Sequence, residues 1–258
     1  MTDVLGRFRL DGKTAIVTGI GPGVGEHVAK AFAEVGASVV CAARTPDKVE
    51  RVAEEIRKAG GKATAVPTDV GRPGDLERLV AKTHEAFGVA HIVFHNAATG
   101  TLERPGDGPW DNTDELWQEA FAVNVLAPHR LARLLMPDME SHGRGSIITV
   151  LSCAGFTPIP PQIAYGSTKA ALLMLTRYLA KICAPHARVN AICPGSMTPD
   201  GSVPPVMERL NLAGRNAIQR IGKADEIVGA ALLLASGASS YTTGSVIFVE
   251  GGRVGTVA

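Results

Sequence analysis

The strongest constraint on the fold is the alternation of short β-branched runs with longer segments whose apolar spacing is helical. Runs such as "TAIVT" (14–18) and "HIVFHNA" (91–97) are apolar on both faces, which is typical of parallel strands covered by helices on both sides. The predicted strands are 14–18, 37–43, 62–68, 91–97, 145–152, 187–193 and 245–250. The predicted helices are 26–36, 46–60, 73–88, 113–139, 162–184 and a last helix from Ala224.

This order predicts an α/β fold, with one doubly wound (Rossmann) parallel sheet of about seven strands and helices on both faces. No internal repeat or low-complexity linker divides the chain, so we expect a single domain over 1–258. Ligands of such sheets bind outside the carboxyl ends of the strands. We therefore assign cofactor binding to about 10–150, and catalysis and the substrate loops to about 151–250.

Charge and composition argue against several classes of partner. The 26 basic and 25 acidic residues nearly cancel without a charged block, whereas nucleic-acid phosphates need a basic face. No apolar run reaches the ~18 residues that a membrane span needs, and the first residues lack the order of a signal peptide. The four cysteines lack CxxC pairs and nearby histidines, which predicts buried free thiols and no metal site. We expect a cytoplasmic protein that binds neither nucleic acid nor membrane.

The segment "TGIGPGVG" (18–25) joins the first predicted strand to the first predicted helix. Its glycines allow a ligand to approach the backbone closely, and the free N–H groups at the start of the helix favour an anion. A pyrophosphate meets both conditions; a turn that only packs is the alternative. The GxGxxG fingerprint is not met, because Val24 stands where its third glycine would be. The cofactor-binding candidates in this turn are Thr18, Gly19, Gly21, Gly23, Val24 and Gly25.

The segment "YGSTK" places Tyr165 four residues before Lys169. On a helix these two side chains share a face, with Cβ atoms ~5–6 Å apart. A cation ~4 Å from the phenol at an effective dielectric of ~20 contributes ~4 kcal/mol. That energy would lower a tyrosine pKa of ~10 by up to about three units if burial did not oppose it. Lys169 is therefore expected to bring Tyr165 into the range of acid–base catalysis, although an isolated YxxxK is more often a solvated pair.

Taken together, these motifs resemble those of the short-chain dehydrogenase/reductase family, in its single-domain branch of about this length. The pattern TGxxxGxG carries the resemblance in the glycine turn, and "HNAA" (95–98) is similar to the family's NNAG motif. Ser152 lies thirteen residues before Tyr165, which is the family spacing, and Asn124 stands in "FAVNV" where the family has a helix asparagine. The further positions that match cofactor-binding motifs are Asp69, Val70, Asn96, Ala97, Pro194, Gly195 and Thr198.

The resemblance implies an NAD(P)(H)-dependent oxidoreductase that interconverts a ketone and a secondary alcohol by hydride transfer. Tyr165 would be the general acid and base, and Ser152 would bind the substrate oxygen. Lys169 would also bind the nicotinamide ribose, and Asn124 would hold a water in a proton relay from Lys169. Asp69 would contact the adenine. The residues that would line the rest of the cofactor are Asn96, Pro194, Gly195 and Thr198.

Two neighbours of these residues are interpreted without a catalytic role. His95 replaces the first asparagine of the family's NNAG motif, and a histidine at the end of a strand is usually structural. Cys153 directly follows Ser152 and is expected to point to the opposite side of the strand. We therefore assign no chemistry to either side chain.

The end of the second predicted strand bears on the choice of cofactor. NAD enzymes of this architecture place a carboxylate there to bind the ribose 2′-hydroxyl, but this chain has Ala43 followed by Arg44. An arginine pairs well with a 2′-phosphate, so NADP(H) is favoured over NAD(H). Against this, Pro22 stands in the glycine turn where many NADP enzymes of the family have a second basic residue, and a solvated Arg44 is the alternative.

The substrate is expected to lie between three irregular segments, 98–112, 155–164 and 196–220. Their apolar groups favour a small-molecule ketone or secondary alcohol of apolar character, such as a steroid-like, acyl or terpenoid compound. A 3-oxoacyl thioester reductase, acting on acyl carrier protein or CoA, is the alternative enzyme. A nucleotide-binding sensor or scaffold without turnover is the alternative of another class. From the resemblance we also expect a homotetramer or homodimer, with helices 113–139 and 162–184 between subunits.

Overall fold

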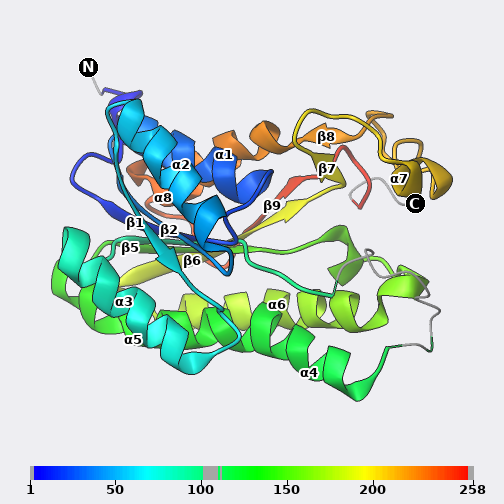
Figure 1. Ribbon diagram of the computed structural model, residues 1–258, viewed down its shortest axis with the longest axis horizontal. Helices are drawn as coiled ribbons and strands as arrows, with labels where there is room; N and C mark the ends of the chain where they lie inside the picture. The colour runs from blue at the N-terminus through cyan, green and yellow to red at the C-terminus, as the bar shows by residue number, and fades with distance from the viewer. Residues whose placement is uncertain (1–2, 101–109, 111, 255–258) are drawn as a thin grey trace.

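The computed structural model describes residues 3–100, 110 and 112–254, and its centre is one seven-stranded parallel sheet (Figure 1). The strand order is β3-β2-β1-β4-β5-β6-β9, so the predicted doubly wound sheet is confirmed. The order reverses between β1 and β4, which is the point where such sheets bind ligands. The strand bounds are β1 (Thr14–Thr18), β2 (Ser38–Ala43), β3 (Lys62–Pro67), β4 (Ile92–His95), β5 (Gly145–Val150), β6 (Ala187–Pro194) and β9 (Val246–Val249).

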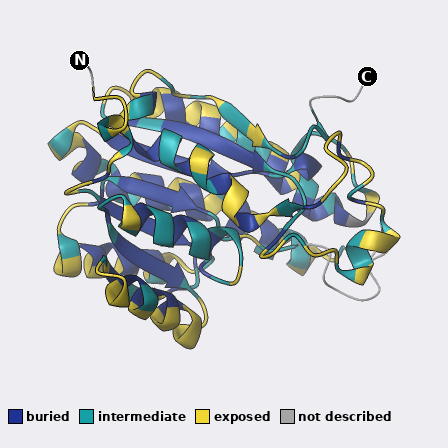
Figure 2. Cartoon of the chain, turned by 90° about the horizontal axis from the view of Figure 1, so that it is seen from above, coloured by how far each residue is buried: buried dark blue, intermediate teal, exposed yellow. Residues whose placement is uncertain are grey.

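Helices cover both faces of this sheet, and each buries an apolar stripe against it (Figure 1). Val28 and Phe32 of α1 belong to the core on one face, and Leu131 and Leu135 of α5 to the core on the other. Figure 2 shows the strands buried and the outer sides of the helices exposed, as expected for amphipathic helices on a buried sheet. One layer contains α1 (Val24–Glu34), α2 (Pro46–Lys58) and α8 (Val228–Ala235). The other contains α3 (Pro73–Phe87), α4 (Asp114–Phe121), α5 (Ala127–His142) and α6 (Ile163–Ile182).

The segment 113–139, predicted as one helix, contains a π-helical turn. α4 ends at Phe121, the π turn η2 spans Ala122–Leu126, and α5 follows directly. Pro128 has no N–H, so the carbonyl of Asn124, four residues earlier, lacks its α-helical donor. A π turn shifts the pairing by one residue and accommodates this loss. The turn carries Asn124, one of the predicted site residues.

The segment 195–222, predicted as a loop, contains short elements beyond the carboxyl end of the sheet (Figure 1). β7 (Met197–Thr198) pairs with β8 (Gly222–Lys223), and α7 (Pro205–Arg209) lies between them in the chain. In the expected substrate loop 98–112, residues 101–109 and 111 lie outside the described residues. The remaining short turns are η1 (Gly6–Phe8), η3 (Cys153–Gly155), η4 (Pro160–Gln162), η5 (Ala224–Ile227) and η6 (Gly237–Ser239).

All four cysteines are buried and free, as predicted. In the described part of the chain, no helix has the length and apolar character needed to cross a membrane. The same residues contain no group of three or more histidine, cysteine, aspartate or glutamate side chains that could hold a metal ion.

Candidate functional site

A cavity of about 340 Å³ opens at the carboxyl ends of β1, β2, β3 and β4. These strand ends are far apart in the sequence, and the parallel sheet brings them to one edge. The predicted cofactor residues that line the cavity are Gly19, Arg44, Asp69, Val70, Asn96 and Ala97. Residues that line it without having been predicted are Ile20, Ala43, Thr45, Lys48, Thr68, Ala98, Thr99 and Val123.

The glycine turn between β1 and α1 has the shape needed to hold an anionic ligand. Gly19 has φ +73°, and a Cβ there would lie 2.6 Å from the backbone nitrogen of Ala97, so a side chain does not fit. Cβ atoms at Gly21 and Gly23 would meet no described atom within 4 Å, which leaves open space beside the turn. α1 begins at Val24, and among the described residues no side chain caps its first N–H groups. Open space and uncapped N–H groups fit the pyrophosphate of a dinucleotide.

Thr18 and Asn96 hold this turn against β4. Thr18 is fully buried, and its Oγ1 accepts a hydrogen bond from the backbone N–H of Ala97 at 3.2 Å. Asn96 Nδ2 donates to the carbonyl of Gly19 at 2.9 Å. Thr18 therefore supports the turn from the buried side. Asn96 both hydrogen-bonds to the turn and lines the cavity.

The end of β2 contributes two exposed cations to the cavity. Arg44 follows β2 directly, and Lys48 lies four residues later in the first turns of α2. Within the described part of the chain, neither side chain makes an ion pair, and Thr45, the residue before α2, makes no side-chain capping bond. The sequence analysis missed Lys48, although its spacing of four residues from Arg44 was readable. These two cations are therefore available to pair with a negatively charged group of a ligand.

Asp69 lies across the cavity from these cations, after β3. Its Oδ1 accepts the N–H of Gly71 at 3.0 Å, and its own N–H donates to Asp75 at 2.8 Å. The short turn 69–71 is therefore fixed by the side chain of Asp69 and by Asp75 of α3. Asp69 is oriented by the protein and does not need a ligand to hold it.

A second group of predicted residues meets where β5 ends beside α6. Ser152 lies two residues after β5, Tyr165 lies in the first turn of α6, and hydrogen bonding with Ser152 acts to lower the pKa of Tyr165. Gly166 permits this approach, because a Cβ there would lie 2.7 Å from the carbonyl oxygen of Ala154. Gly155 packs as closely, since its Cβ would lie 2.9 Å from the carbonyl carbon of Lys169. These two glycines let η3, and with it Ser152, lie directly on α6.

Lys169 lies one turn after Tyr165 and is almost fully buried. Its Nζ donates to the carbonyl of Val150 at 2.7 Å and lies 5.5 Å from the centroid of the Tyr165 ring. Burial penalises the ammonium and lowers the pKa of Lys169 to about 8. The expected shared helix face is therefore present, with the ammonium over the ring and bound to the end of β5.

The predicted electrostatic effect of Lys169 on Tyr165 is wrong for this structure. The pKa of Tyr165 is raised to about 12, because burial of the phenol outweighs the hydrogen bond from Ser152, and the nearby thiols Cys193 and Cys153 act in the same direction as burial. The prediction from the spacing of four residues did not include burial, and burial has the larger effect on the pKa of Tyr165. At neutral pH Tyr165 is therefore a protonated phenol beside a buried lysine.

Asn124 is fully buried in η2 and uses its amide to join three segments. Its Oδ1 accepts the N–H of Thr99 at 3.0 Å, and its Nδ2 donates to the carbonyl of Thr99 at 3.0 Å and to Thr168 Oγ1 at 2.9 Å. Thr168 in turn donates to the carbonyl of Tyr165 at 2.7 Å. Asn124 thus ties the chain after β4 to the helix that carries Tyr165. Its part in a proton relay stays a prediction.

Pro194 and Gly195 end β6 beside β9. A Cβ at Gly195 would lie 2.8 Å from the Cα of Glu250, so glycine is required by this contact. Thr198 is buried in β7, and its hydroxyl donates to the carbonyl of Ser202 at 2.8 Å. This hydroxyl is used within its own loop, and the predicted contact of Thr198 with the cofactor stays a prediction.

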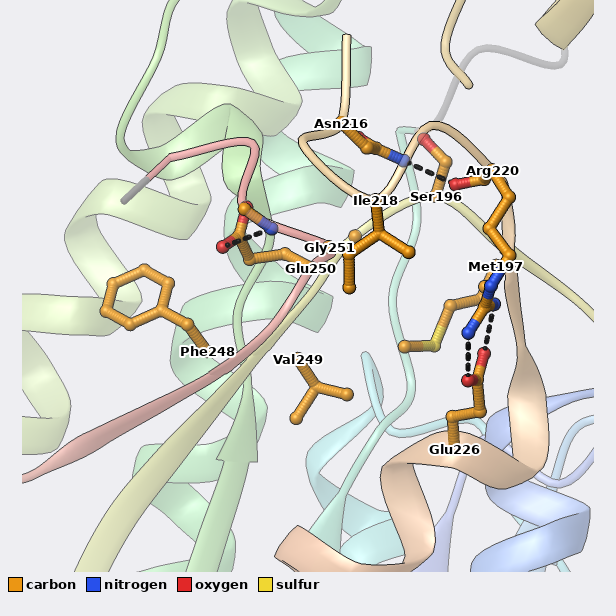
Figure 3. Close-up of a pocket in the computed structure, with 13 residues that line it drawn as sticks. Ser196, Met197, Asn216, Ile218, Arg220, Glu226, Phe248, Val249, Glu250 and Gly251 are labelled. Carbon is orange, nitrogen blue, oxygen red and sulfur yellow. Dashed lines mark hydrogen bonds and ion pairs between the residues drawn. The ribbon is translucent and has the colours of Figure 1, made fainter. Parts of the chain in front are cut away.

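A cavity of about 300 Å³ lies beyond Gly195, between the segment 195–222 and the end of β9 (Figure 3). Figure 3 shows Arg220 paired with Glu226 at one side and the apolar groups Met197 and Ile218 between them and β9. Ser152, Tyr165 and Lys169 do not line it. Among the predicted site residues, Gly195 lines this cavity.

His95 lies at the end of β4, between the two groups. It is buried, and its Nδ1 lies 3.3 Å from Thr18 Oγ1. Burial, and then the charge of Lys169, lower its pKa to about 3. A neutral, buried histidine agrees with the interpretation of His95 as a structural residue.

The comparison with known families decides the classification. Residues 19–253 match the model of a family described as enoyl-(acyl carrier protein) reductase. The chain belongs to the short-chain dehydrogenase/reductase family. Proteins of this family are oxidoreductases, so this short-chain dehydrogenase/reductase is an enzyme of that class.

Relatives of this short-chain dehydrogenase/reductase cover its whole fold. An uncharacterised oxidoreductase of Mycobacterium tuberculosis is 39% identical over 253 residues, covering 96% of this chain and 95% of the relative. A 7α-hydroxysteroid dehydrogenase solved with NADH and 7-oxo glycochenodeoxycholic acid has a TM-score of 0.90 at 34% identity, covering 98% of each chain. The L-sorbose reductase of Gluconobacter frateurii, solved with NADPH and L-sorbose, has a TM-score of 0.88 at 32% identity, covering 97% of this chain and 100% of that one. Structures similar to this chain thus hold NAD or NADP nucleotides.

The geometry of this short-chain dehydrogenase/reductase separates binding from acid–base chemistry. The cavity at β1–β4 offers cations for a nucleotide, and the glycine turn beside it leads to the uncapped N–H groups of α1. Ser152 and Tyr165 offer two hydroxyls for a substrate oxygen, with Lys169 behind them. Both groups lie at the carboxyl edge of one sheet, so a bound cofactor and a substrate can meet there.

Proposed function

We propose that this protein interconverts a ketone and a secondary alcohol by hydride transfer with NADP(H), and that Tyr165 is the general acid and base. Ser152 binds the substrate oxygen, and Lys169 supports the phenol and binds the nicotinamide ribose. The assembly of Ser152 at the end of β5 with the buried pair Tyr165 and Lys169 is the observation that carries the proposal. Two neighbouring hydroxyls can both donate to one oxygen atom, which is the requirement for stabilising a developing alkoxide.

The proton chemistry follows from the protonation states of these side chains. The nicotinamide dinucleotide supplies or accepts the hydride. With its pKa raised to about 12, Tyr165 carries its proton at neutral pH and is ready to give it to the substrate oxygen. Lys169, with a pKa lowered to about 8, lies one turn away and has a proton to replace it. These states favour reduction of a ketone over oxidation of an alcohol at neutral pH.

Asn124, Asp69 and the glycine turn have supporting roles in this proposal. Asn124 keeps α6 and the chain after β4 in register, so that Tyr165 faces the cofactor, and takes part in the relay from Lys169. Asp69, with Val70, binds the adenine end of the nucleotide. The residues that hold the remaining nucleotide groups are Thr18, Gly19, Gly21, Gly23, Val24, Gly25, Asn96, Ala97, Pro194, Gly195 and Thr198.

The preference for NADP(H) is supported by the two exposed cations after β2. Arg44 and Lys48 line the same cavity, and paired cations bind a 2′-phosphate better than a 2′-hydroxyl. Ala43 is the residue at the end of β2, so a carboxylate does not repel the phosphate at that position. Lys48 supplies the second basic group that the glycine turn lacks.

An apolar substrate is supported by the side chains around the carboxyl edge. Phe156 and Phe248 meet edge to face, with ring centroids 5.1 Å apart, and Met197 and Ile218 lie nearby on the segment after β6. The relative solved with a 7-oxo bile acid acts on a steroid, whereas L-sorbose reductase is solved with a sugar. We therefore propose a ketone on an apolar skeleton as the substrate class.

The test is a panel of carbonyl compounds incubated with NADPH, with nicotinamide absorbance followed. The panel contains a 7-oxo bile acid, L-sorbose, a 3-oxoacyl thioester and a terpenoid ketone. Turnover of the apolar ketones supports the proposal, and preferred turnover of the thioester would replace it with an acyl-thioester reductase. Tight NADPH binding, measured by nicotinamide fluorescence, without turnover of any carbonyl compound would indicate a sensor or scaffold.

We also propose that the protein is a homotetramer or homodimer in a reducing compartment such as the cytoplasm. Met174, Tyr178 and Ile182 of α6 are 50%, 62% and 69% exposed, and their spacing of four residues places them on one helix face. An apolar stripe of this kind is typical of an interface. The substitution Ile182→Asp should lower the mass measured by light scattering, and an unchanged monomer mass for both proteins would contradict the proposal.

A further inference from the structure

Two thiols lie together beside the proposed catalytic residues. Cys153 opens η3 directly after Ser152, and Cys193 is the last residue but one of β6. Both are buried in one cluster with Leu151, Leu172 and Ala191. β5 and β6 are neighbours in the sheet, with Val150 opposite Ile192, so the two cysteines stand on adjacent segments at the edge where the chemistry is proposed.

Cys153 Sγ donates to the carbonyl of Pro194, the residue after Cys193, at 3.5 Å. This hydrogen bond ties η3 to the end of β6 beside the second thiol. Hydrogen bonding with Cys193 lowers the pKa of Cys153, aided by Arg253, and raises that of Cys193. Cys153 is therefore the thiol that ionises first and becomes the nucleophile.

The other two cysteines, Cys41 and Cys183, are expected to be unreactive thiols. Burial raises the pKa of Cys41 to about 12, and burial also raises the pKa of Cys183. In the described part of the chain neither belongs to the cluster of Cys153 and Cys193. Cys153 differs from Cys41 and Cys183 because its pKa is lowered, whereas theirs are raised.

We propose that Cys153 and Cys193 form a hydroperoxide-reactive dithiol site, whose closure to a disulfide displaces Ser152 and stops turnover. The thiolate of Cys153 attacks one oxygen of the hydroperoxide, the O–O bond breaks, and the protonated leaving oxygen departs as water or an alcohol. Cys193 then attacks the resulting sulfenic acid, loses its proton and expels the hydroxyl as water. Two thiols are oxidised by two electrons, and one hydroperoxide is reduced by two.

Closure of this bond must move the chain that carries Ser152. Bonded sulfur atoms lie ~2.05 Å apart with Cβ atoms ~3.8 Å apart, which is closer than two unbonded thiols can pack. η3 therefore has to move toward β6. Ser152 adjoins Cys153 and is held by the N–H of Ala154 at 3.2 Å, so the serine moves with η3 and leaves Tyr165.

The surroundings select for a small oxidant. Cys153 is only 4% exposed, and Phe156 and Val254 pack on the same cluster. A bulky disulfide reagent cannot reach the sulfur without local opening. Hydrogen peroxide is therefore the probe of choice.

The experiment treats the full-length protein with hydrogen peroxide and reads out the bond by mass spectrometry. We expect the intact protein to lose the mass of two hydrogen atoms, and peptide mapping to recover a peptide that joins Cys153 to Cys193. Ketone reduction should fall at least tenfold in parallel and return on treatment with dithiothreitol. Cys183→Ala is the matched control and should behave like the wild type, whereas Cys193→Ala should form no cross-link and no reversible inactivation.

Cross-linking is read without any enzyme assay, so this result stands apart from the proposed function. Failure to recover the Cys153–Cys193 peptide from protein whose accessible methionines the same treatment has oxidised would overturn the site. Full turnover by the cross-linked protein would overturn the displacement of Ser152. Equal reversible inactivation of Cys193→Ala and the wild type would also overturn that displacement, because the loss of turnover would then come from oxidation of Cys153 alone.

Discussion

The nucleotide cavity and the catalytic group lie on the same edge of one sheet, yet they are built in opposite ways. The cavity at β1–β4 is open and lined by the exposed cations Arg44 and Lys48, and the uncapped N–H groups of α1 follow the glycine turn that borders it. Tyr165 and Lys169 are buried, and their polar atoms already bond to Ser152 and to the end of β5. Nucleotide binding therefore relies on polar groups without protein partners. Proton transfer relies on side chains that the protein already holds by hydrogen bonds. The two regions should therefore respond differently to substitution.

The largest effect is expected from Tyr165→Phe, which removes the phenol hydroxyl and leaves the ring. Turnover should fall by ~10²–10⁴-fold, the usual contribution of positioned acid–base catalysis. NADPH binding, followed by nicotinamide fluorescence, should change little, because the nucleotide cavity lies elsewhere. Tyr241→Phe is the matched control, because Tyr241 is fully exposed. Retention of more than about a tenth of turnover by Tyr165→Phe would contradict the mechanism.

The next effect concerns the open region and the choice of cofactor. The double substitution Arg44→Ala and Lys48→Ala should weaken NADPH binding by ~10–100-fold and leave NADH binding unchanged, because charge-assisted hydrogen bonds contribute ~1.5–3 kcal/mol each and exposure reduces this. Lys58→Ala, at the far end of α2, is the control. Equal loss for both nucleotides, or no loss, would make Arg44 a solvated bystander.

A smaller effect should come from the packing that joins η3 to α6. Gly166→Ala puts a methyl group 2.7 Å from the carbonyl oxygen of Ala154, and such overpacking costs about 1–3 kcal/mol of unfolding free energy. Turnover should fall with stability, since Ser152 must shift away from Tyr165. At Gly229 of α8 a Cβ would meet no described atom within 4 Å, so Gly229→Ala should leave urea unfolding unchanged or raise its midpoint. Equal stability of Gly166→Ala and the wild type would contradict the close contact.

The last effect, absent at neutral pH, is the dependence of stability on pH through His95. Its folded-state pKa, about 3, lies below the ~6.5 of a free histidine. Below pH ~6.5 the unfolded chain therefore binds a proton that the folded chain does not, so stability falls on acidification by up to ~1.4 kcal/mol per pH unit. His95→Asn should flatten this fall between pH 6.5 and pH 4 in thermal unfolding followed by circular dichroism. An identical slope for both proteins would show that His95 is not buried in its neutral form.

Much of this architecture was readable from local patterns. β-branched runs and helical spacing predicted all seven strands of the sheet, because hydrophobic periodicity follows directly from side-chain direction. The positions of Gly19, Ser152, Tyr165 and Lys169 were predicted from motif spacing, and the structure brings the last three together. The π turn at Asn124 was missed, since Pro128 lies inside a segment whose apolar spacing is otherwise helical.

Other features depend on distances between segments that no spacing encodes. Lys48 joins Arg44 in one cavity only because α2 starts beside the end of β2. Cys153 was expected on the far side of a strand, but β5 ends at Val150 and η3 turns the thiol toward Cys193. Neither contact has a local pattern in the sequence.

The sequence by itself determined the parallel sheet, the glycine turn and the Tyr165–Lys169 helix face, because each depends on residues close together in the chain. Only the tertiary structure decided the protonation of those residues. The packing of η3 and β5 over α6 buries the phenol and the ammonium, so desolvation outweighs their mutual attraction. The pKa of Tyr165 consequently rises, where the spacing of four residues alone predicted a fall.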